Sequence, residues 1–229
     1  MATGKLWIVA TPIGNLDDLT ARAREALQLA DVVACEDTRR TGRLLQKLGF
    51  KKRLVSLHEH NERQRLGALL ETLESGLSVA LVSDAGTPLL SDPGFLLVRA
   101  AIGQGVEVSP VPGASALLAA LVASGLPPYP FTFAGFPPPK AGRRKRFYRR
   151  LSELDHTLVI FESPHRLLAS LADAGEELGD RPVTLGRELT KKHEEFLRGS
   201  LGEILERLKS RPSLKGEFVL VVGARPDRD

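Results

Sequence analysis

The sequence predicts two α/β domains, the first with a mostly parallel β-sheet and the second with a mixed sheet. The prediction rests on three apolar runs that read as buried strands and that each end in a turn of small residues, Gly and Pro. The runs and their turns are Leu6–Thr11 with Pro12–Asn15, Ser78–Val82 with Ser83–Pro88, and Val106–Val111 with Pro112–Ser115. Parallel strands direct their carboxyl ends to one edge of a sheet, so we expect these loops to line a single crevice.

Helical and strand-like segments alternate through the first half of the chain, which is typical of a parallel α/β sheet. Apolar residues recur at helical spacing in Leu19–Ala30, Gly67–Leu73 and Leu96–Ile102. The short apolar runs Val32–Cys35 and Leu54–Leu57 predict two more strands, and we expect Cys35 to be a buried packing residue. Ala114–Ser124 then predicts a helix that ends at Gly125.

A proline-rich stretch, Leu126–Pro130, cannot continue that helix and predicts a stiff connector. We therefore expect an amino-terminal domain over residues 1–125, a linker over 126–130 and a carboxyl-terminal domain over 131–229. The second domain is expected to begin with a strand at Phe131–Ala134. A rigid proline turn at Gly135–Pro139 and a helix that starts near Arg143 follow it.

The remainder of the second half predicts further strands and helices. Strands are expected at Thr157–Phe161, Pro182–Arg187, Phe196–Ser200 and Glu217–Val222. Ser163 is expected to cap a helix that has Pro164 at its first position and runs to about Leu178. Ser200 and Glu203 form a capping-box pattern for a helix through Leu208. Two strands in succession indicate a mixed sheet.

Composition favours a globular protein of the cytoplasm. The 229 residues fit one large domain or two small ones, and an apolar content of 42% suffices for a core. A single cysteine excludes an internal disulfide framework, which fits a reducing compartment. Met1–Lys5 is too short for a signal peptide, and no apolar run approaches the ~20 residues of a membrane span.

One segment carries a concentrated positive charge. Lys140–Arg150 contains seven basic residues and no acid, whereas the rest of the chain is net acidic. A local patch of this kind is expected where a protein meets a polyanion, and we favour RNA. The alternative is a solvated helix face.

The loops after the three strands do not resemble a nucleotide phosphate site, because neither G-x-x-x-x-G-K-[ST] nor G-x-G-x-x-G occurs there. They offer backbone groups, the carboxylate of Asp84 and the hydroxyls of Ser83, Thr87 and Ser115, with no Lys or Arg. This chemistry suits a ligand with a positive centre, an amine and ribose hydroxyls, such as S-adenosylmethionine. The alternative is a set of ordinary turns between strands and helices.

These motifs together resemble the tetrapyrrole-methylase-like methyltransferases, and most closely their ribosomal RNA branch, the small subunit methyltransferase I family. The segments that carry the resemblance are Thr11–Leu16, Glu36–Arg39, Leu57–Glu62, Ser83–Pro88, Glu162–Arg166, Arg187–Thr190 with Lys191, and Lys215–Phe218. They extend over nearly the whole chain, and their order is more specific than any one of them.

The resemblance implies S-adenosylmethionine as methyl donor and, as acceptor, a ribose 2′-hydroxyl of a cytidine in the decoding region of 16S rRNA. It also implies a cofactor cleft between two domains, a homodimer, and the assembled small subunit as substrate. Donor contacts are expected at Pro12, Gly14, Asp84, Gly86, Thr87, Ala114, Ser115 and Phe161. Of these, Phe161 ends a strand, so it either packs against the adenine or belongs to the core.

A ribose hydroxyl is a poor nucleophile, so a group that accepts its proton would assist the transfer. The catalytic candidates are Glu36, Asp37, His58 and His60, and Glu62, Glu162 and Glu188 are further possible proton acceptors. His58 and His60 lie close in sequence, with no Cys nearby and no third histidine at metal-site spacing, so no metal is expected.

RNA contacts are expected at Arg39, Arg40, Lys140, Arg143, Arg144, Lys145 and Arg146. Arg39 and Arg40 follow two acids, so they either anchor a phosphate or pair with those acids. A family motif whose role is open is matched by Arg187, Glu188 and Lys191. Alternatively, these residues form a structural salt-bridge network. Two other functions compete: methylation of a tetrapyrrole-type small molecule, and a non-catalytic RNA-binding role in assembly.

Overall fold

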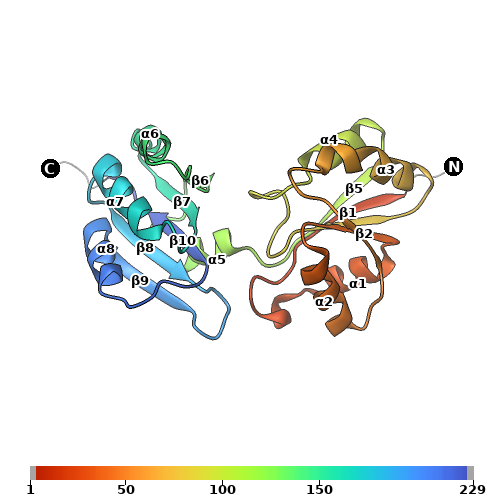
Figure 1. Ribbon diagram of the computed structural model, residues 1–229, viewed down its shortest axis with the longest axis horizontal. Coiled ribbons are helices and arrows are strands. Elements are labelled where there is room, and N and C mark those ends of the chain that lie inside the picture. The colour runs from red at the N-terminus through yellow and green to blue at the C-terminus, as the bar shows by residue number, and fades with distance from the viewer. Residues whose placement is uncertain (1–3, 226–229) are drawn as a thin grey trace. The chain divides into compact units, whose positions relative to one another are not determined.

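The computed structural model describes residues 4–225 and divides into two compact units, the first ending at Ser115 and the second beginning at Ala116 (Figure 1). Residues 1–3 and 226–229, which the predicted domain ranges include, lie outside the described residues. Each unit contains one five-stranded sheet.

The sheet of the first unit is parallel throughout. Its strands are β1 (Lys5–Val9), β2 (Val32–Cys35), β3 (Arg53–Ser56), β4 (Val79–Val82) and β5 (Glu107–Val111). They lie in the order β3-β2-β4-β1-β5, and every neighbouring pair is parallel. All five loops that leave the carboxyl ends of these strands therefore emerge at one edge, as the sequence predicts.

Helices cover both faces of this sheet (Figure 1). They are α1 (Ala21–Leu29), α2 (Thr38–Leu48), α3 (Glu62–Glu74) and α4 (Phe95–Gly103), with a short 3₁₀ helix, η1, at Leu16–Asp18. One apolar cluster joins α1 and α2 to the sheet and includes the buried Cys35. A second cluster joins α3 and α4 to the opposite face through Leu69, Leu73 and Leu97.

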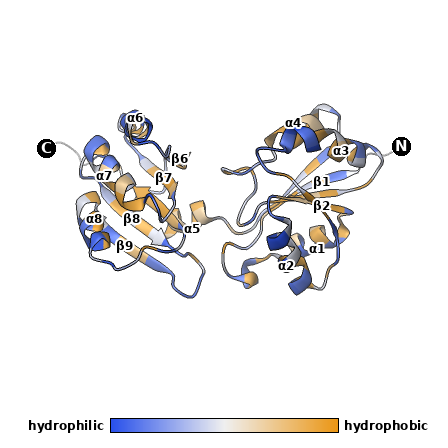
Figure 2. Ribbon diagram, viewed as in Figure 1, coloured by the Kyte–Doolittle hydropathy of each residue, from blue (hydrophilic) through white to orange (hydrophobic). Residues whose placement is uncertain are grey.

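The second unit has the predicted mixed sheet. Its strands are β6 (Phe131–Gly135), β7 (Thr157–Glu162), β8 (Pro182–Arg187), β9 (Glu195–Ser200) and β10 (Phe218–Val222). The order is β6-β7-β10-β8-β9. Among these neighbours, β6 and β7 pair in parallel and the other three pairs are antiparallel. The strands of both sheets are mostly hydrophobic, whereas α2 and α6 are mostly hydrophilic (Figure 2).

The helices of the second unit are α5 (Ala116–Ala123), α6 (Ala141–Leu151), α7 (Leu167–Leu178) and α8 (Leu201–Lys209). Side chains of α6, α7 and α8 share one apolar cluster with the sheet. Helix α5 contacts β7 and β10. The division between the units therefore precedes this helix, whereas the sequence suggested a boundary at the proline-rich stretch that follows it.

The two predicted helix starts in this unit have different outcomes. The capping box of Ser200 and Glu203 is present as predicted. The predicted cap at Ser163 is wrong, because α7 begins at Leu167. The Ser163 hydroxyl instead accepts a hydrogen bond from the guanidinium of Arg166 at 3.1 Å. None of the helices within residues 4–225 combines the length and the apolar character needed to cross a membrane.

Candidate functional site

Three loops at the carboxyl edge of the first sheet are hydrogen-bonded to one another. Thr11, after β1, and Gly86, after β4, exchange backbone N–H···O bonds of 2.9 Å in both directions. The hydroxyl of Thr87 donates to the carbonyl of Ala114, after β5, at 3.2 Å. The loops that the sequence predicted to line one crevice are thus brought together.

Two glycines in these loops occupy positions that leave little room for a side chain. Gly86 has a φ of +81°, and a Cβ there would lie 3.2 Å from Cγ2 of Ile13. A Cβ on Gly113 would lie 3.1 Å from Cβ of Ala10. The loops therefore present backbone groups and hydroxyls rather than bulky side chains, which fits a ligand that approaches the backbone closely. Their lack of Lys and Arg fits a cationic ligand such as S-adenosylmethionine.

Asp84 connects the β4 loop to the start of α2. One carboxylate oxygen accepts the backbone N–H of Asp37 at 3.0 Å, and the other lies 3.4 Å from the guanidinium of Arg40. The side chain keeps 21% exposure, so it remains accessible. Its predicted contact with the donor amine or ribose stays a prediction, and so do the contacts of Pro12, Gly14 and Ser115 in the same loops.

Next to this loop lies a cavity of about 480 Å³ with acidic and imidazole groups in its lining. It is lined by Glu36, His58, Glu59, His60, Glu62, Ser91, Asp92 and Pro93. The structure thus brings together three of the four catalytic candidates, Glu36, His58 and His60. It adds Asp92, which sequence reasoning missed. The sequence did contain a signal for Asp92. It is the Asp of the Ser91–Gly94 turn, which follows shortly after the recognised Ser83–Pro88 motif.

Two acids of this cavity, Glu36 and Asp92, hold protons more tightly than ordinary carboxyls. Burial, and then the nearby charge of Asp84, raise the pKa of Glu36. Burial and the charge of Glu36 raise the pKa of Asp92 to about 6, although a hydrogen bond with Ser83 acts in the opposite direction. The Nδ1 atom of His58 is buried without a hydrogen-bond partner among the described residues. The cavity therefore holds a proton acceptor, Asp92, whose pKa of about 6 lies near neutral pH.

The other candidates in this region are engaged in local structure. Asp37 caps α2 by accepting the backbone N–H of Arg39 at 2.8 Å, and it pairs with the Arg39 guanidinium, also at 2.8 Å. These hydrogen bonds hold the pKa of Asp37 well below its usual range, so Asp37 is a weak proton acceptor. Arg39 thus pairs with one of the two acids that precede it, which is one of the two alternatives that the sequence left open, whereas Arg40 lies beside Asp84 of the β4 loop.

Comparison with known proteins places these features in a family. Residues 5–205 match the Tetrapyrrole (Corrin/Porphyrin) Methylases. A relative from Micromonospora olivasterospora, named ribosomal RNA small subunit methyltransferase I, is 50% identical over 98% of this chain and 72% of its own length. One of the same name from Haemophilus influenzae is 46% identical over 99% of this chain and 81% of its own. The chain belongs to the ribosomal RNA small subunit methyltransferase I family.

Solved structures share the fold of this family member at low sequence identity. Diphthine synthase superimposes with a TM-score of 0.75 at 20% identity, covering 98% of this chain and 92% of that one. Cobalt precorrin-4 methyltransferase, a cobalamin biosynthetic enzyme, superimposes with a TM-score of 0.68 at 20% identity, covering 96% and 94%. At this identity the likeness shows the fold alone, and it confirms the predicted tetrapyrrole methylase fold.

In this methyltransferase family member, the basic segment forms α6, and acids of α7 neutralise part of it. Arg144 is buried and lies 2.6 Å from Asp173. Lys145 lies 2.5 Å from Glu176, and Arg149 lies 2.9 Å from Glu177. The expectation that this segment lacks counter-charges is therefore wrong for these cations. The guanidinium of Arg144 is buried against a carboxylate, which argues against its predicted contact with RNA.

Other sequence candidates lie in the second unit. Phe161, in β7, packs its ring against Phe133 and Phe136 at centroid distances of 4.9 and 5.5 Å. Its predicted contact with adenine stays a prediction. Lys191 pairs with Glu188 at 2.8 Å and with Glu217 at 3.1 Å, which joins two of the family motifs. Arg187 likewise lies 3.4 Å from Glu195, so this segment forms the salt-bridge network that the sequence named as its alternative.

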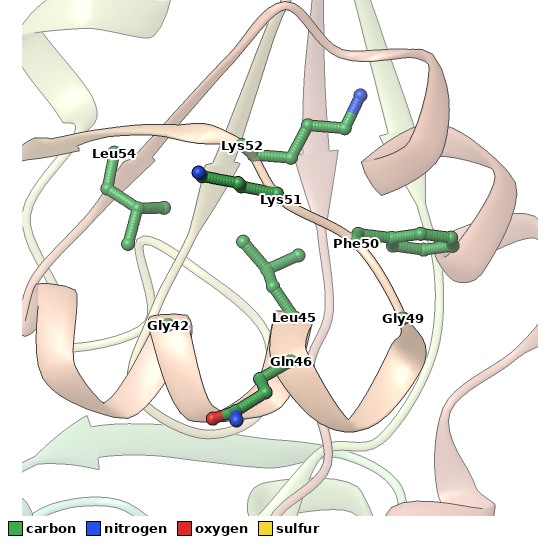
Figure 3. A pocket seen from close by; sticks show the side chains of 8 residues that line it. All are labelled: Gly42, Leu45, Gln46, Gly49, Phe50, Lys51, Lys52 and Leu54. Atoms are coloured by element: carbon green, nitrogen blue, oxygen red, sulfur yellow. The ribbon is translucent and has the colours of Figure 1, made fainter.

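A further cavity of about 420 Å³ lies between α2 and the segment that enters β3 (Figure 3). It opens at the amino end of β3, which is the opposite edge of the sheet from the donor loops. The ammonium of Lys52, in its lining, donates to the carbonyls of Gln28 and Ala30 at 2.5 and 2.8 Å. This cavity is therefore separate from the loops that are expected to bind the methyl donor. Among residues 4–225, no group of three or more His, Cys, Asp or Glu is arranged to hold a metal ion.

Proposed function

We propose that this protein transfers a methyl group from S-adenosylmethionine to the ribose 2′-hydroxyl of a cytidine in the decoding region of 16S rRNA. The observation that carries the proposal is the identity of 46 to 50% to the two named relatives, which extends over nearly the whole chain. The choice of ribose and of cytidine rests on the resemblance of the sequence motifs. The joined loops and the adjoining acidic cavity support a methyltransferase that has both a donor-binding site and candidate proton acceptors.

The loops after β1, β4 and β5 are the proposed binding site of the methyl donor. S-adenosylmethionine, when bound, supplies a methyl group that is activated by the positive charge of its sulfonium. The Thr11–Gly86 and Thr87–Ala114 hydrogen bonds preorganise the loops, so less ordering is needed when the ligand binds. The Asp84 carboxylate provides a negative charge for the amine or the ribose hydroxyls.

Asp92 is the proposed acceptor of the proton that the ribose hydroxyl releases. A general base works best when its pKa lies near the operating pH, and the pKa of Asp92, raised to about 6 by burial and by Glu36, meets that condition. At neutral pH most of this carboxyl is ionised and ready to accept a proton. Glu36 and His58 lie in the same lining and are the alternatives.

Two competing functions receive less support. A tetrapyrrole-type activity on a small molecule would match structures that share only 20% of the sequence. A non-catalytic assembly factor would not need acids of raised pKa beside the donor loops. The proposal also includes a homodimer, as the resemblance implies, which analytical ultracentrifugation tests.

The test is incubation of the protein with radiolabelled S-adenosylmethionine and either naked 16S rRNA or assembled small ribosomal subunits, followed by nucleoside analysis. We expect label in 2′-O-methylcytidine, and more of it with assembled subunits. Label in a tetrapyrrole precursor but not in RNA would favour the first competitor. Donor binding in calorimetry without transfer to any substrate would favour the second.

A further inference from the structure

Helix α6 presents two faces with different electrostatic character. Arg143, Arg146 and Arg150 follow one another at the three- and four-residue spacing that places side chains on one face of a helix. The same face carries Phe147 and Leu151. Together with Pro138 these residues line a groove of about 440 Å³.

The remaining cations of α6 are already neutralised. Arg144, Lys145 and Arg149 each pair with a carboxylate of α7, at distances between 2.5 and 2.9 Å. Within residues 4–225, no acid forms an ion pair with the three arginines of the groove. Within α6, the positive charge that no acid neutralises therefore lies on the groove face.

Three neighbouring guanidinium groups repel one another, so a row without counter-charges favours a ligand that carries several negative charges. Guanidinium groups match phosphate oxygens in geometry and can bind them in bidentate fashion. The groove also has an apolar lining in Pro138, Phe147 and Leu151, which a sugar or a base can cover between two phosphates. A nucleic acid strand offers both phosphate charges and a sugar or base between them, whereas an isolated phosphate offers only the charge.

The protein holds the wall of this groove in place. The carbonyl of Pro139 accepts a hydrogen bond from the Arg144 guanidinium at 3.1 Å, and the carbonyl of Pro137 accepts one from Arg166 at 3.4 Å. Arg144 thus ties the proline turn to α6, and Arg166 ties it to the start of α7. The unpaired cations are left to contact a ligand.

We propose that Arg143, Arg146 and Arg150 form a subsite for the phosphate backbone of single-stranded RNA, and that Arg144, Lys145 and Arg149 are structural. This assignment rests on the proposed function. It moves the RNA contact within the basic segment away from Arg144 and Lys145 and adds Arg150, which the sequence had not selected.

The test compares two double variants that remove the same charge from the same helix. Arg146→Gln/Arg150→Gln removes groove cations, and Lys145→Gln/Arg149→Gln removes paired ones. Binding of a labelled oligouridylate and of small ribosomal subunits is measured against salt concentration by fluorescence anisotropy. Circular dichroism verifies the fold, and calorimetry with S-adenosylmethionine verifies the donor site.

The groove variant should lose about tenfold in RNA affinity, and the slope of log affinity against log salt should fall by about 1.4, or roughly 0.7 for each lost phosphate contact. The paired variant should keep the parent slope. Equal changes in both variants, or no change in the groove variant, would overturn the assignment. A loss for subunits but not for oligouridylate would point to a ribosomal protein and would also overturn it. Failure of the proposed function is recognised separately, by the absence of methyl transfer in the parent protein.

Discussion

Replacement of Asp92 by Asn is expected to stabilise the protein above neutral pH while it slows methyl transfer. The pKa of Asp92 is raised from an ordinary value of 3.8 to about 6, first by burial and then by the charge of Glu36. A pKa difference of this size corresponds to about 3 kcal/mol of unfavourable energy for the ionised form. Because the side chain is only half-buried, solvent screening reduces this to about 1–2 kcal/mol.

The sign follows from proton linkage. With a folded-state pKa above the unfolded value, the stability contributed by the protonated carboxyl is complete below about pH 4 and is lost as the pH rises through about 6. Asn is neutral at every pH, so Asp92→Asn should match the parent near pH 4. It should exceed the parent near pH 8 by about 1–2 kcal/mol, or roughly 2–8 °C in Tm.

Thermal denaturation at both pH values checks the stability, and the rate of methyl transfer against pH checks the chemistry. The parent rate should rise with pH up to about pH 6 and then become constant. In Asp92→Asn this rise should disappear, and the rate should fall about 100-fold. Glu59→Gln is the control, because Glu59 lines the same cavity with a side chain that is 83% exposed. It should change neither Tm nor the pH profile. A Tm difference that does not depend on pH, or a pH limb that survives in Asp92→Asn, would refute the reasoning.

Three further variants test other parts of the structure. Asp173→Ala should destabilise by about 3 kcal/mol in urea denaturation because it leaves the buried Arg144 guanidinium unpaired, and an unchanged midpoint would contradict this. Gly86→Ala should lower donor affinity in calorimetry and reduce stability by about 1 kcal/mol, since its φ is +81° and Ile13 lies in the path of the new Cβ. Asp84→Asn should weaken donor binding about tenfold, or ~1.5 kcal/mol, while the protein stays folded. Parent affinity in that variant would remove Asp84 from the donor site.

The sequence predicted the parallel sheet and its loops well because both depend on local patterns. Strands such as Val79–Val82 are short apolar runs, and the Gly and Pro that follow them mark turns wherever they occur. Helix α2, by contrast, was not predicted as a helix. Thr38–Leu48 buries only Thr41 and Leu45, and it contains Gly42, so its apolar periodicity is weak.

Packing between distant segments could not be predicted from these local patterns. Helix α5 precedes a proline-rich stretch that resembles a domain boundary, yet its contacts with β7 and β10 place it in the second unit. Arg144 meets Asp173 in another helix, and only the fold reveals that this cation is neutralised. Asp92 became a candidate because it is buried beside Glu36. These two residues are far apart in the sequence.

The most direct test of the proposed reaction uses a small ribosomal subunit in which the target nucleotide is a single 2′-deoxycytidine. This substrate lacks the proposed nucleophile but keeps the phosphates that dominate affinity for RNA. It should bind to the protein nearly as tightly as the unmodified subunit and should accept no methyl group, while the unmodified subunit becomes labelled in 2′-O-methylcytidine. Transfer of methyl to the deoxy subunit would contradict ribose methylation and would place the reaction on the base.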